Sequence, residues 1–181
     1  MKQRLKKVYQ KLIGTKLKHY LKFSNITNIH QIPKIKKIVI NRRVGAQSLK
    51  MVETLRLELS YISGQSGMIT HSRSSVAGFK IRNKVPVGII VTLRGERMYA
   101  FFDRLVNLRL PRIRDFRGVS TRNFDGDGNF NIGLTEQLIF PEISYEQINQ
   151  LCGIDISTVI SSKVDLQSKV LLIILGIPFR E

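Results

Sequence analysis

Hydrophobic and polar residues alternate between Val87 and Arg94 as in a half-buried β-strand. The odd-numbered residues up to Leu93 are all apolar, whereas the even-numbered positions end in Thr92 and Arg94. After Gly95 the apolar spacing lengthens to that of an amphipathic helix. The pattern therefore predicts a strand with one core face and one partly polar, basic face, followed directly by a helix.

A second predicted strand covers residues 35–41 and also has a polar ending. Asn41, Arg42 and Arg43 follow a run of aliphatic residues. Both predicted strands end in polar side chains with amide, hydroxyl or guanidinium groups. We therefore expect their ends to contact an anion or water. The two polar endings are the first candidates for a functional site.

The remaining pattern alternates short strands with helices. One helix is predicted between Ser48 as its cap and Gly64 as its stop, and a short buried helix over 170–175 between Asp165 as a possible cap and Gly176. Further strands are predicted at 68–70, 79–82, 131–134 and 154–160. This interleaving predicts an α+β sandwich.

The length of the chain suits one compact domain. It has 181 residues, of which 43% are hydrophobic, and no Gly/Ser-rich or Pro-rich linker interrupts them. We therefore expect a single domain over residues 1–181.

The positive charge is concentrated towards the N-terminus. The net charge is +17, and residues 1–50 contain fourteen Lys and Arg but no Asp or Glu. Residues 123–181 reverse the sign, with three basic and eight acidic side chains. A chain polarised in this way usually presents its basic side to a polyanion. Nucleic acid is the leading partner, and an anionic membrane surface is the next.

The N-terminal helix allows two interpretations. Its lysines surround one apolar stripe, formed by Leu5, Val8, Tyr9, Leu12 and Ile13. Such a helix can lie in a membrane interface, but we favour a basic helix packed on its own domain. No apolar run has the length of a transmembrane span, and we find no secretory signal. The first twenty-three residues, with one Arg and no Ser, are also unlike a transit peptide.

Few residues suggest metal or redox chemistry. Cys152 is the only cysteine, and His19, His30 and His71 have no metal-ligand spacing. A calcium-loop spacing does occur at Asp125, Asp127, Asn129 and Glu136. However, Phe130 stands where such a loop needs glycine, so a hairpin turn explains the segment better. We expect neither a metal nor a cofactor.

Long blocks of the chain resemble one known family, in order along the sequence. The most specific are SVAGFKIR, VTLRGERM and PRIRDFRG, accompanied by FDGDGNFNIGL and EQLIFPEI. They resemble ribosomal protein five of the large subunit, in the bacterial form of the universal family that binds 5S ribosomal RNA. The resemblance covers essentially the whole chain.

The resemblance implies a structural protein of the ribosome, not an enzyme. The expected fold is a mostly antiparallel sheet packed on one side by helices, in the central protuberance of the large subunit. The expected partners are 5S ribosomal RNA, large-subunit ribosomal RNA, peptidyl-site transfer RNA, small-subunit ribosomal protein thirteen and other central-protuberance proteins. No membrane partner is implied.

Carried over residue by residue, the resemblance places the 5S contacts on Asn41, Gln65, Thr92 and Arg94. Amide and hydroxyl groups can exchange hydrogen bonds with ribose 2′-hydroxyls and base edges, and a guanidinium neutralises phosphate. Arg43 replaces a glycine that is usual in the family, which implies either a reshaped turn or an additional phosphate contact.

Two further surfaces are implied by the resemblance. The transfer-RNA loop falls on residues 70–84, with Arg73, Ser74, Ser75, Lys80 and Arg82, and we expect its tip to be exposed and mobile. The intersubunit bridge falls on Arg112, Arg114, Arg117, Asn129 and Asn131. Bacterial members often carry more basic residues where this chain has His71 and Ser74, so we expect a weaker contact with transfer RNA.

The composition and the resemblance together suggest a plastid protein made inside the organelle. The chain has the abundant Lys, Ile and Asn that AT-rich genes produce, and RGERMYAFFDRLVNL resembles plastid members of the family. A bacterial cytoplasm is the alternative. Outside the family, a DNA-binding architectural protein or a basic hydrolytic enzyme are the functions to be distinguished from RNA binding.

Overall fold

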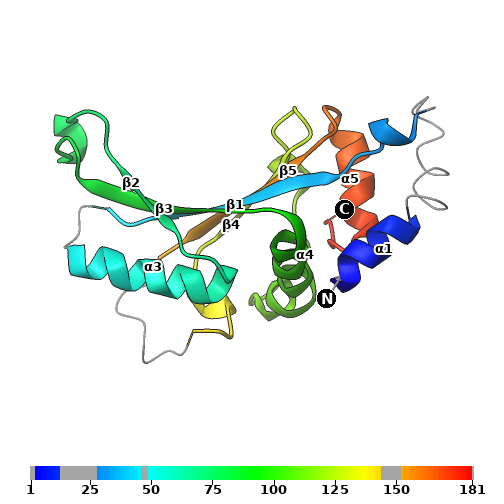
Figure 1. The fold of residues 1–181 in the computed structure, drawn as a ribbon, viewed down its shortest axis with the longest axis horizontal. Coiled ribbons are helices and arrows are strands. Elements are labelled where there is room, and N and C mark those ends of the chain that lie inside the picture. The colour runs from blue at the N-terminus through cyan, green and yellow to red at the C-terminus, as the bar shows by residue number, and fades with distance from the viewer. Residues whose placement is uncertain (1–2, 13–27, 46–48, 144–151, 181) are drawn as a thin grey trace. The chain divides into compact units, whose positions relative to one another are not determined.

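A computed structural model describes residues 3–12, 28–45, 49–143 and 152–180 (Figure 1). The helices and strands in this part of the chain are α1 (Arg4–Leu12), β1 (Ile35–Arg43), α3 (Leu49–Ser63), β2 (Met68–His71), β3 (Pro86–Leu93), α4 (Gly95–Arg104), β4 (Phe130–Leu134), β5 (Ile154–Ile160) and α5 (Asp165–Ile174). The strands form one five-stranded antiparallel sheet in the order β2-β3-β1-β5-β4. The predicted α+β fold is confirmed.

The chain divides into two compact units. The first contains residues 1–38, 94–132 and 157–181, and the second contains residues 39–93 and 133–156. Each unit is described by itself below. The single domain expected from the sequence stays a prediction.

The second unit is built where α3 packs against β2 and β3 (Figure 1). The apolar stripe of α3 is fully buried, as its helical spacing predicts, and consists of Val52, Leu55, Leu59 and Ile62. Gly64, at φ +72°, ends the helix in a left-handed turn. Ile89, Val91 and Leu93 of β3 are buried as well. Val87, which the alternation placed with them, is only half-buried.

An arginine lies in the core of this unit. Arg42 has 0% of its surface exposed, and its Nη1 donates to Glu58 Oε2 of α3 over 2.8 Å. Its Nη2 donates to the buried Oε1 of Gln137, which follows β4 in the chain. The sequence pattern grouped Arg42 with the polar strand ending, and that grouping is wrong. Strand alternation turns its side chain inward, while Asn41 and Arg43 are exposed.

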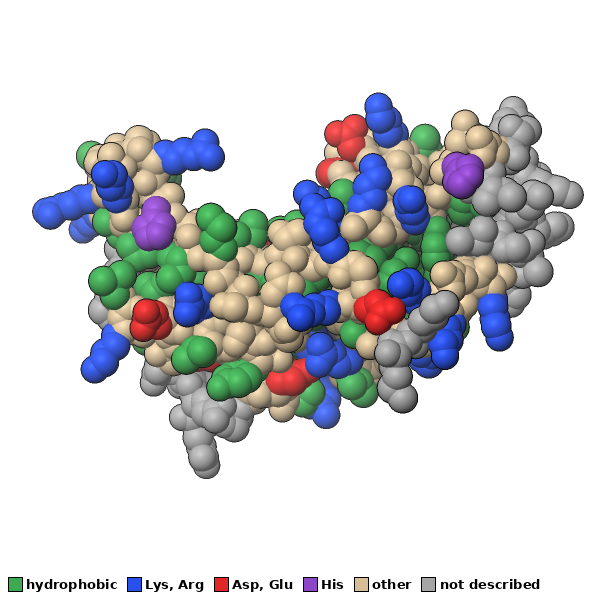
Figure 2. Space-filling view, viewed as in Figure 1, with side chains coloured by type: hydrophobic (Ala, Val, Ile, Leu, Met, Phe, Trp, Pro, Cys, Tyr) green, Lys and Arg blue, Asp and Glu red, His purple; other side chains and the backbone are tan. Residues whose placement is uncertain are grey.

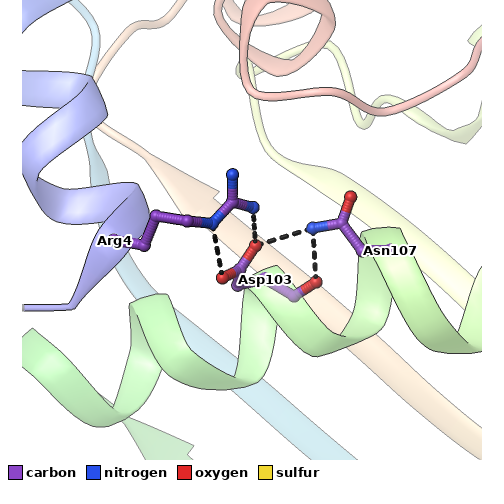
Figure 3. Close-up of polar contacts among 3 residues, drawn as sticks. All are labelled: Arg4, Asp103 and Asn107. Atoms are coloured by element: carbon purple, nitrogen blue, oxygen red, sulfur yellow. Dashed lines mark hydrogen bonds and ion pairs between the residues drawn. The ribbon is translucent and has the colours of Figure 1, made fainter.

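In the first unit, α1 packs on α4. Leu5 and Tyr9 are buried, whereas Val8 is 36% exposed. Arg4 donates to Asp103 on α4, whose carboxylate also accepts a 2.6 Å bond from Asn107 (Figure 3). The interpretation of a helix packed on its own domain is confirmed. Ile13 lies outside the described residues, and none of the helices described is long and apolar enough to cross a membrane.

The amphipathic helix predicted after Gly95 is confirmed as α4, with Met98 and Phe102 buried. It continues into a wider π-helical turn over Leu105–Arg109 and a 3-10 turn that contains Pro111. Arg109 is fully buried in this turn, with its guanidinium 5.0 Å from the ring centroid of Phe101. The sequence pattern gave no indication of the change in helical pitch.

The C-terminal helix is longer than predicted but ends where expected. α5 begins at Asp165 and ends at Ile174, and Gly176, which has φ +100°, follows its C-cap Leu175. Asp165 was predicted to cap this helix. The capping position is in fact Val164, and the carboxylate of Asp165 accepts a 2.8 Å bond from the backbone of Gly128 instead.

Two loop predictions have opposite outcomes. The strand predicted at 79–82 is wrong, because this segment holds a 3-10 turn over Ala77–Phe79 and an isolated bridge between Val76 and Ile81. The hairpin turn at Asp125 is confirmed. Its carboxylate accepts a bond from the Asn129 side chain, and further bonds from the backbones of residues 129 and 127, and these hold the pKa of Asp125 below its usual value. Phe130 begins β4 and is buried.

The buried ion pair gives a first prediction. Glu58→Ala should lower the free energy of unfolding by about 3–5 kcal/mol, because Arg42 is then left charged in the core with one fewer partner. The double variant Arg42→Met/Glu58→Met should recover a large part of that loss. Urea unfolding measures both effects. Arg4→Ala is the control, since an exposed pair is worth only about 0–1 kcal/mol. Equal losses in the Glu58 and Arg4 variants would contradict the prediction.

Tyr9 gives a second prediction. Burial, with a smaller contribution from Tyr99, raises the pKa of its phenol from 10.0 to about 12, and the hydroxyl donates to the carbonyl of Pro33 over 3.0 Å. The unfolded chain ionises first, so the stabilisation by Tyr9 is complete below pH 10 and is lost as the pH rises towards 12.

Tyr9→Phe removes both the hydrogen bond and the ionisation. At neutral pH the variant should be less stable by about 0.5–1.5 kcal/mol. Above pH 10 this difference in the free energy of unfolding should shrink, and effects of lysine titration cancel because both proteins share them. A difference that stays constant up to pH 12 in urea titrations would show that the phenol ionises equally in both states.

Candidate nucleic-acid interface

Polar groups lie side by side across three strands of the second unit, on the face opposite α3. Thr70 of β2 pairs with Gly88 of β3. A Cβ atom at Gly88 would lie 3.0 Å from Thr70 Oγ1 and 3.9 Å from Asn41 Oδ1 of β1. Arg43 projects from the same strand as Asn41, two residues further on, and is also exposed. We call the surface formed by Asn41, Arg43, Thr70, Gly88 and Asp155 the open face.

Asp155 completes the open face from β5. Its neighbours Ile154 and Ile156 are fully buried, so alternation turns Asp155 outward, and it is exposed. Its Oδ1 lies 3.6 Å from the position of a Cβ atom on Gly133 of β4. The sequence analysis did not select Asp155. The alternation predicted for residues 154–160 was consistent with an outward-facing Asp155. It could not show which residues of other strands lie beside this side chain.

Gln65 and Thr92, two of the expected RNA contacts, are brought together by the turn after α3. The side-chain amide of Gln65 donates to the backbone carbonyl of Thr92 over 3.3 Å. The Ser63 hydroxyl fixes this turn, because it accepts from the backbone N–H of Gln65 and also donates to its carbonyl. Gln65 and Thr92 are half-buried, and the hydroxyl of Thr92 lies on the face of β3 that Gly88 shares.

Arg94 directly follows β3 and occupies the N-cap position of α4. Its backbone is extended, with φ −137° and ψ 161°, and the residue is exposed. Its side chain makes no capping hydrogen bond. The guanidinium is therefore free of a structural role at the start of the helix. Arg94 belongs to the first unit, and Asn41, Gln65 and Thr92 belong to the second.

The segment between β2 and β3 forms a lobe on the side of the sheet away from α3 (Figure 1). Its backbone is tied by its own bonds: Ser72 donates from its hydroxyl to the carbonyl of Arg82 over 2.6 Å, and the Ser75 hydroxyl accepts from the backbone of Asn83 over 3.0 Å. Lys80 and Lys84 have positive φ angles of 54° and 63°.

The lobe presents the residues expected to meet transfer RNA. All of them are exposed, as predicted: Arg73, Ser74, Ser75, Lys80 and Arg82. Figure 2 shows Lys and Arg side chains gathered around this lobe, at the upper left of the view. The expected mobility of the tip stays a prediction.

A cavity of about 570 Å³ lies between the lobe and the open face. The lobe contributes apolar Val76, Phe79 and Ile81 together with Arg73 and Ser74, and the sheet contributes the residues of the open face and Val87. The structure thus joins Asn41 and Arg43, expected at one surface, to Arg73 and Ser74, expected at another. No group of three or more metal-ligating side chains occurs in the described part of the chain.

The residues expected at the intersubunit bridge have different environments. Arg112, Arg114 and Arg117 are exposed, and among the described residues no ion pair joins them to Asp115. Asn131 is exposed on β4. Asn129 is half-buried and its side chain is occupied within the hairpin, where it donates to Asp125 and accepts from the backbone of Ile160. Its role in the hairpin is structural.

Comparison with protein families gives two adjoining matches. Residues 28–82 match the model described as ribosomal protein L5, and residues 86–179 match the C-terminal part of the ribosomal L5P family. Together the two models cover most of the chain. Their junction falls at residues 83–85, within the lobe.

Individual relatives match over the full length. The large ribosomal subunit protein uL5 of Microcystis aeruginosa is 52% identical over 99% of this chain and 100% of its own. The uL5c proteins of Stigeoclonium helveticum and Ostreococcus tauri are 55% and 51% identical, each over 99% of this chain and 99% and 97% of their own lengths. On this evidence, the chain belongs to the ribosomal protein uL5 family.

Proposed function

We propose that this chain binds 5S ribosomal RNA through the polar side of its sheet. As a member of the uL5 family it is a structural, non-enzymatic constituent of the large ribosomal subunit. The observation that carries the finer proposal is the alternation of β1, which buries Arg42 and exposes Asn41 and Arg43 on the face opposite α3. In the second unit α3 lies on the other side of the sheet (Figure 1), and the lobe stands over this face across the cavity.

The chemistry of this side suits RNA that is recognised by shape. Asn41 and Thr92 can donate to and accept from ribose hydroxyls and base edges, and such contacts dominate the recognition of RNA grooves and loops. Arg43 and Arg94 add charges for phosphate, which provide affinity and position. The net charge of +17 supports a polyanionic partner.

Two further contacts belong to the proposal. The lobe between β2 and β3 contacts the peptidyl-site transfer RNA, which is supported by its four exposed basic residues Arg73, Lys80, Arg82 and Lys84. The exposed arginines Arg112, Arg114 and Arg117 contribute to a bridge to small-subunit ribosomal protein thirteen. With these contacts we propose that the chain lies in the central protuberance.

We also propose a plastid location, with synthesis inside the organelle. The support is the composition of the chain and the identity of 51–55% to plastid uL5c proteins. Relatives from cyanobacteria, at 52% identity, keep the bacterial cytoplasm as the alternative. Hybridisation of the gene to purified organellar DNA distinguishes the two.

The third prediction tests 5S binding with substitutions at Thr92 and Arg94, two nearby residues whose side chains differ in chemistry. Arg94→Ala removes one charge, so it should reduce the slope of log affinity against log salt by about 0.7–0.9. Thr92→Val removes a hydroxyl but keeps the shape and the backbone carbonyl that Gln65 uses. It should cost about 0.5–1.5 kcal/mol at every salt concentration without changing the slope.

Filter binding to 5S ribosomal RNA over a salt series measures both effects, with an unrelated RNA hairpin of equal length as the specificity control. Asp127→Asn is a matched protein control, because it alters an exposed charge in the Asp125 turn. Equal affinity of the wild type for 5S RNA and for the hairpin, at all salt concentrations, would refute the proposed function.

The fourth prediction concerns the lobe. The double variant Lys80→Ala/Arg82→Ala removes two exposed charges and no hydrogen-bonding side chain that holds the lobe together. Ribosomes carrying it should bind 5S RNA normally but hold peptidyl-site transfer RNA more weakly, by roughly 0.2–1 kcal/mol per lost exposed charge contact. Toeprinting or filter retention of transfer RNA measures the loss. An unchanged transfer-RNA affinity, or a loss of 5S binding, would contradict the assignment of Lys80 and Arg82 to transfer RNA.

A further inference from the structure

The cavity between the lobe and the open face has apolar and aromatic lining residues, which a site for phosphate alone does not need. Its volume of about 570 Å³ lies within the range of roughly 300–1,000 Å³ that is typical of small-ligand pockets. One wall carries the aromatic ring of Phe79 with Val76 and Ile81. The opposite wall belongs to the sheet and, apart from Val87, is polar. The cavity therefore has the two-sided character of a site for a flat, partly apolar group with polar edges.

The floor of the cavity is kept open by glycine. Gly88 is the third residue of β3, inside the strand, where glycine weakens pairing and often marks the close approach of another group. A side chain there would have its Cβ atom 3.0 Å from Thr70 Oγ1 and 3.1 Å from the carbonyl of Arg42. The absence of a side chain leaves the edges of Asn41 and Thr70 accessible from the cavity.

The charges are arranged asymmetrically around this floor. Arg43 and Arg73 both line the cavity, and Asp155 is the one acidic residue that does so among those described. No ion pair links Asp155 to either arginine in the part of the chain that the structure describes. A carboxylate repels phosphate, so its presence among RNA-binding arginines is unfavourable unless it accepts hydrogen bonds from the ligand.

These observations fit one unstacked nucleotide. Proteins recognise unpaired RNA bases by stacking them on aromatic side chains and by hydrogen-bonding their edges. A carboxylate accepts from base amino groups, and a contact with two hydrogen bonds discriminates best. Guanine is the base whose Watson–Crick edge presents two adjacent donors, the ring N1–H and the exocyclic N2 amino group. Arg43 and Arg73 are placed to neutralise the flanking phosphates.

Resting on the proposed binding of 5S RNA, we propose that this cavity takes up one unpaired guanine, with Asp155 as the residue that selects it. The base lies between Phe79 and the floor at Gly88, and its donor edge faces Asp155. Asn41 supplies the remaining edge contacts. Asp155 lies outside the set of 5S contacts expected from the sequence, and its role is selection between bases rather than charge attraction.

The fifth prediction tests this selection with modified RNA. 5S RNA is transcribed with inosine incorporated sparsely in place of guanine, which deletes only the N2 amino group, and bound and free fractions are mapped by cleavage at the modified sites. Wild-type protein should bind RNA with inosine at one unpaired position more weakly, by roughly 10- to 150-fold, the factor that the loss of one hydrogen bond to a charged group provides. Asp155→Asn should abolish the exclusion at that position and keep it elsewhere.

Two variants control for fold and for charge. Asp155→Asn keeps the size of an exposed side chain, so its thermal unfolding should match that of the wild type. Asp127→Asn changes the net charge equally outside the cavity and should keep the inosine effect. Phe79→Leu retains an apolar residue but removes the ring, and it should weaken binding of unmodified 5S RNA.

The possible results separate the two proposals. If wild-type protein does not bind 5S RNA, the proposed function fails. If it binds 5S RNA but Asp155→Asn leaves the inosine pattern unchanged, or tightens binding equally at all positions, only the guanine site is refuted. A peptide ligand in the cavity would appear as 5S binding that is insensitive to Asp155, Phe79 and inosine alike.

Discussion

The burial of Arg42 is the constraint on which the polar side of this sheet depends. A guanidinium with 0% exposure is costly in a core unless its donors are paired, and Glu58 and Gln137 accept from its two terminal nitrogens, Nη1 and Nη2. A shift of β1 by one residue would turn Arg42 outward and bring Asn41 or Arg43 into the core, where neither has such partners. The ion pair therefore specifies the register of the strand, and through it the side chains on the exposed face of the sheet.

The same alternation separates buried from exposed side chains in the strands of the second unit. α3 occupies the inner face of the sheet, while the lobe between β2 and β3 folds over the outer face (Figure 1). The lobe is held by short-range hydrogen bonds that involve Ser72 and Ser75, not by a core of its own. Its basic residues are therefore free to contact a partner, whereas Phe79 and Ile81 close one side of the cavity.

Much of the fold could be predicted because it is encoded in local periodicity. The apolar stripes of α3 and α4 and the alternation in β3, β4 and β5 follow from spacings of 3.6 and 2 residues, and glycines at positive φ end α3 and α5 where expected. The family resemblance likewise rests on blocks of contiguous sequence. Asn41, Gln65, Thr92 and Arg94 could be selected in this way, although the contact between Gln65 and Thr92 could not.

What the sequence by itself determined is therefore the type and order of most elements, the basic character of the chain and its family. Only the tertiary structure decided that Arg42 points inward, that residues 79–82 form a turn rather than a strand, and that Asp155 faces Arg43 and Arg73 across one cavity. The reason is that local periodicity depends on neighbours within a few residues. Gln137, a partner of Arg42, is 95 residues away along the chain, and only the packing of the sheet brings the two side chains together.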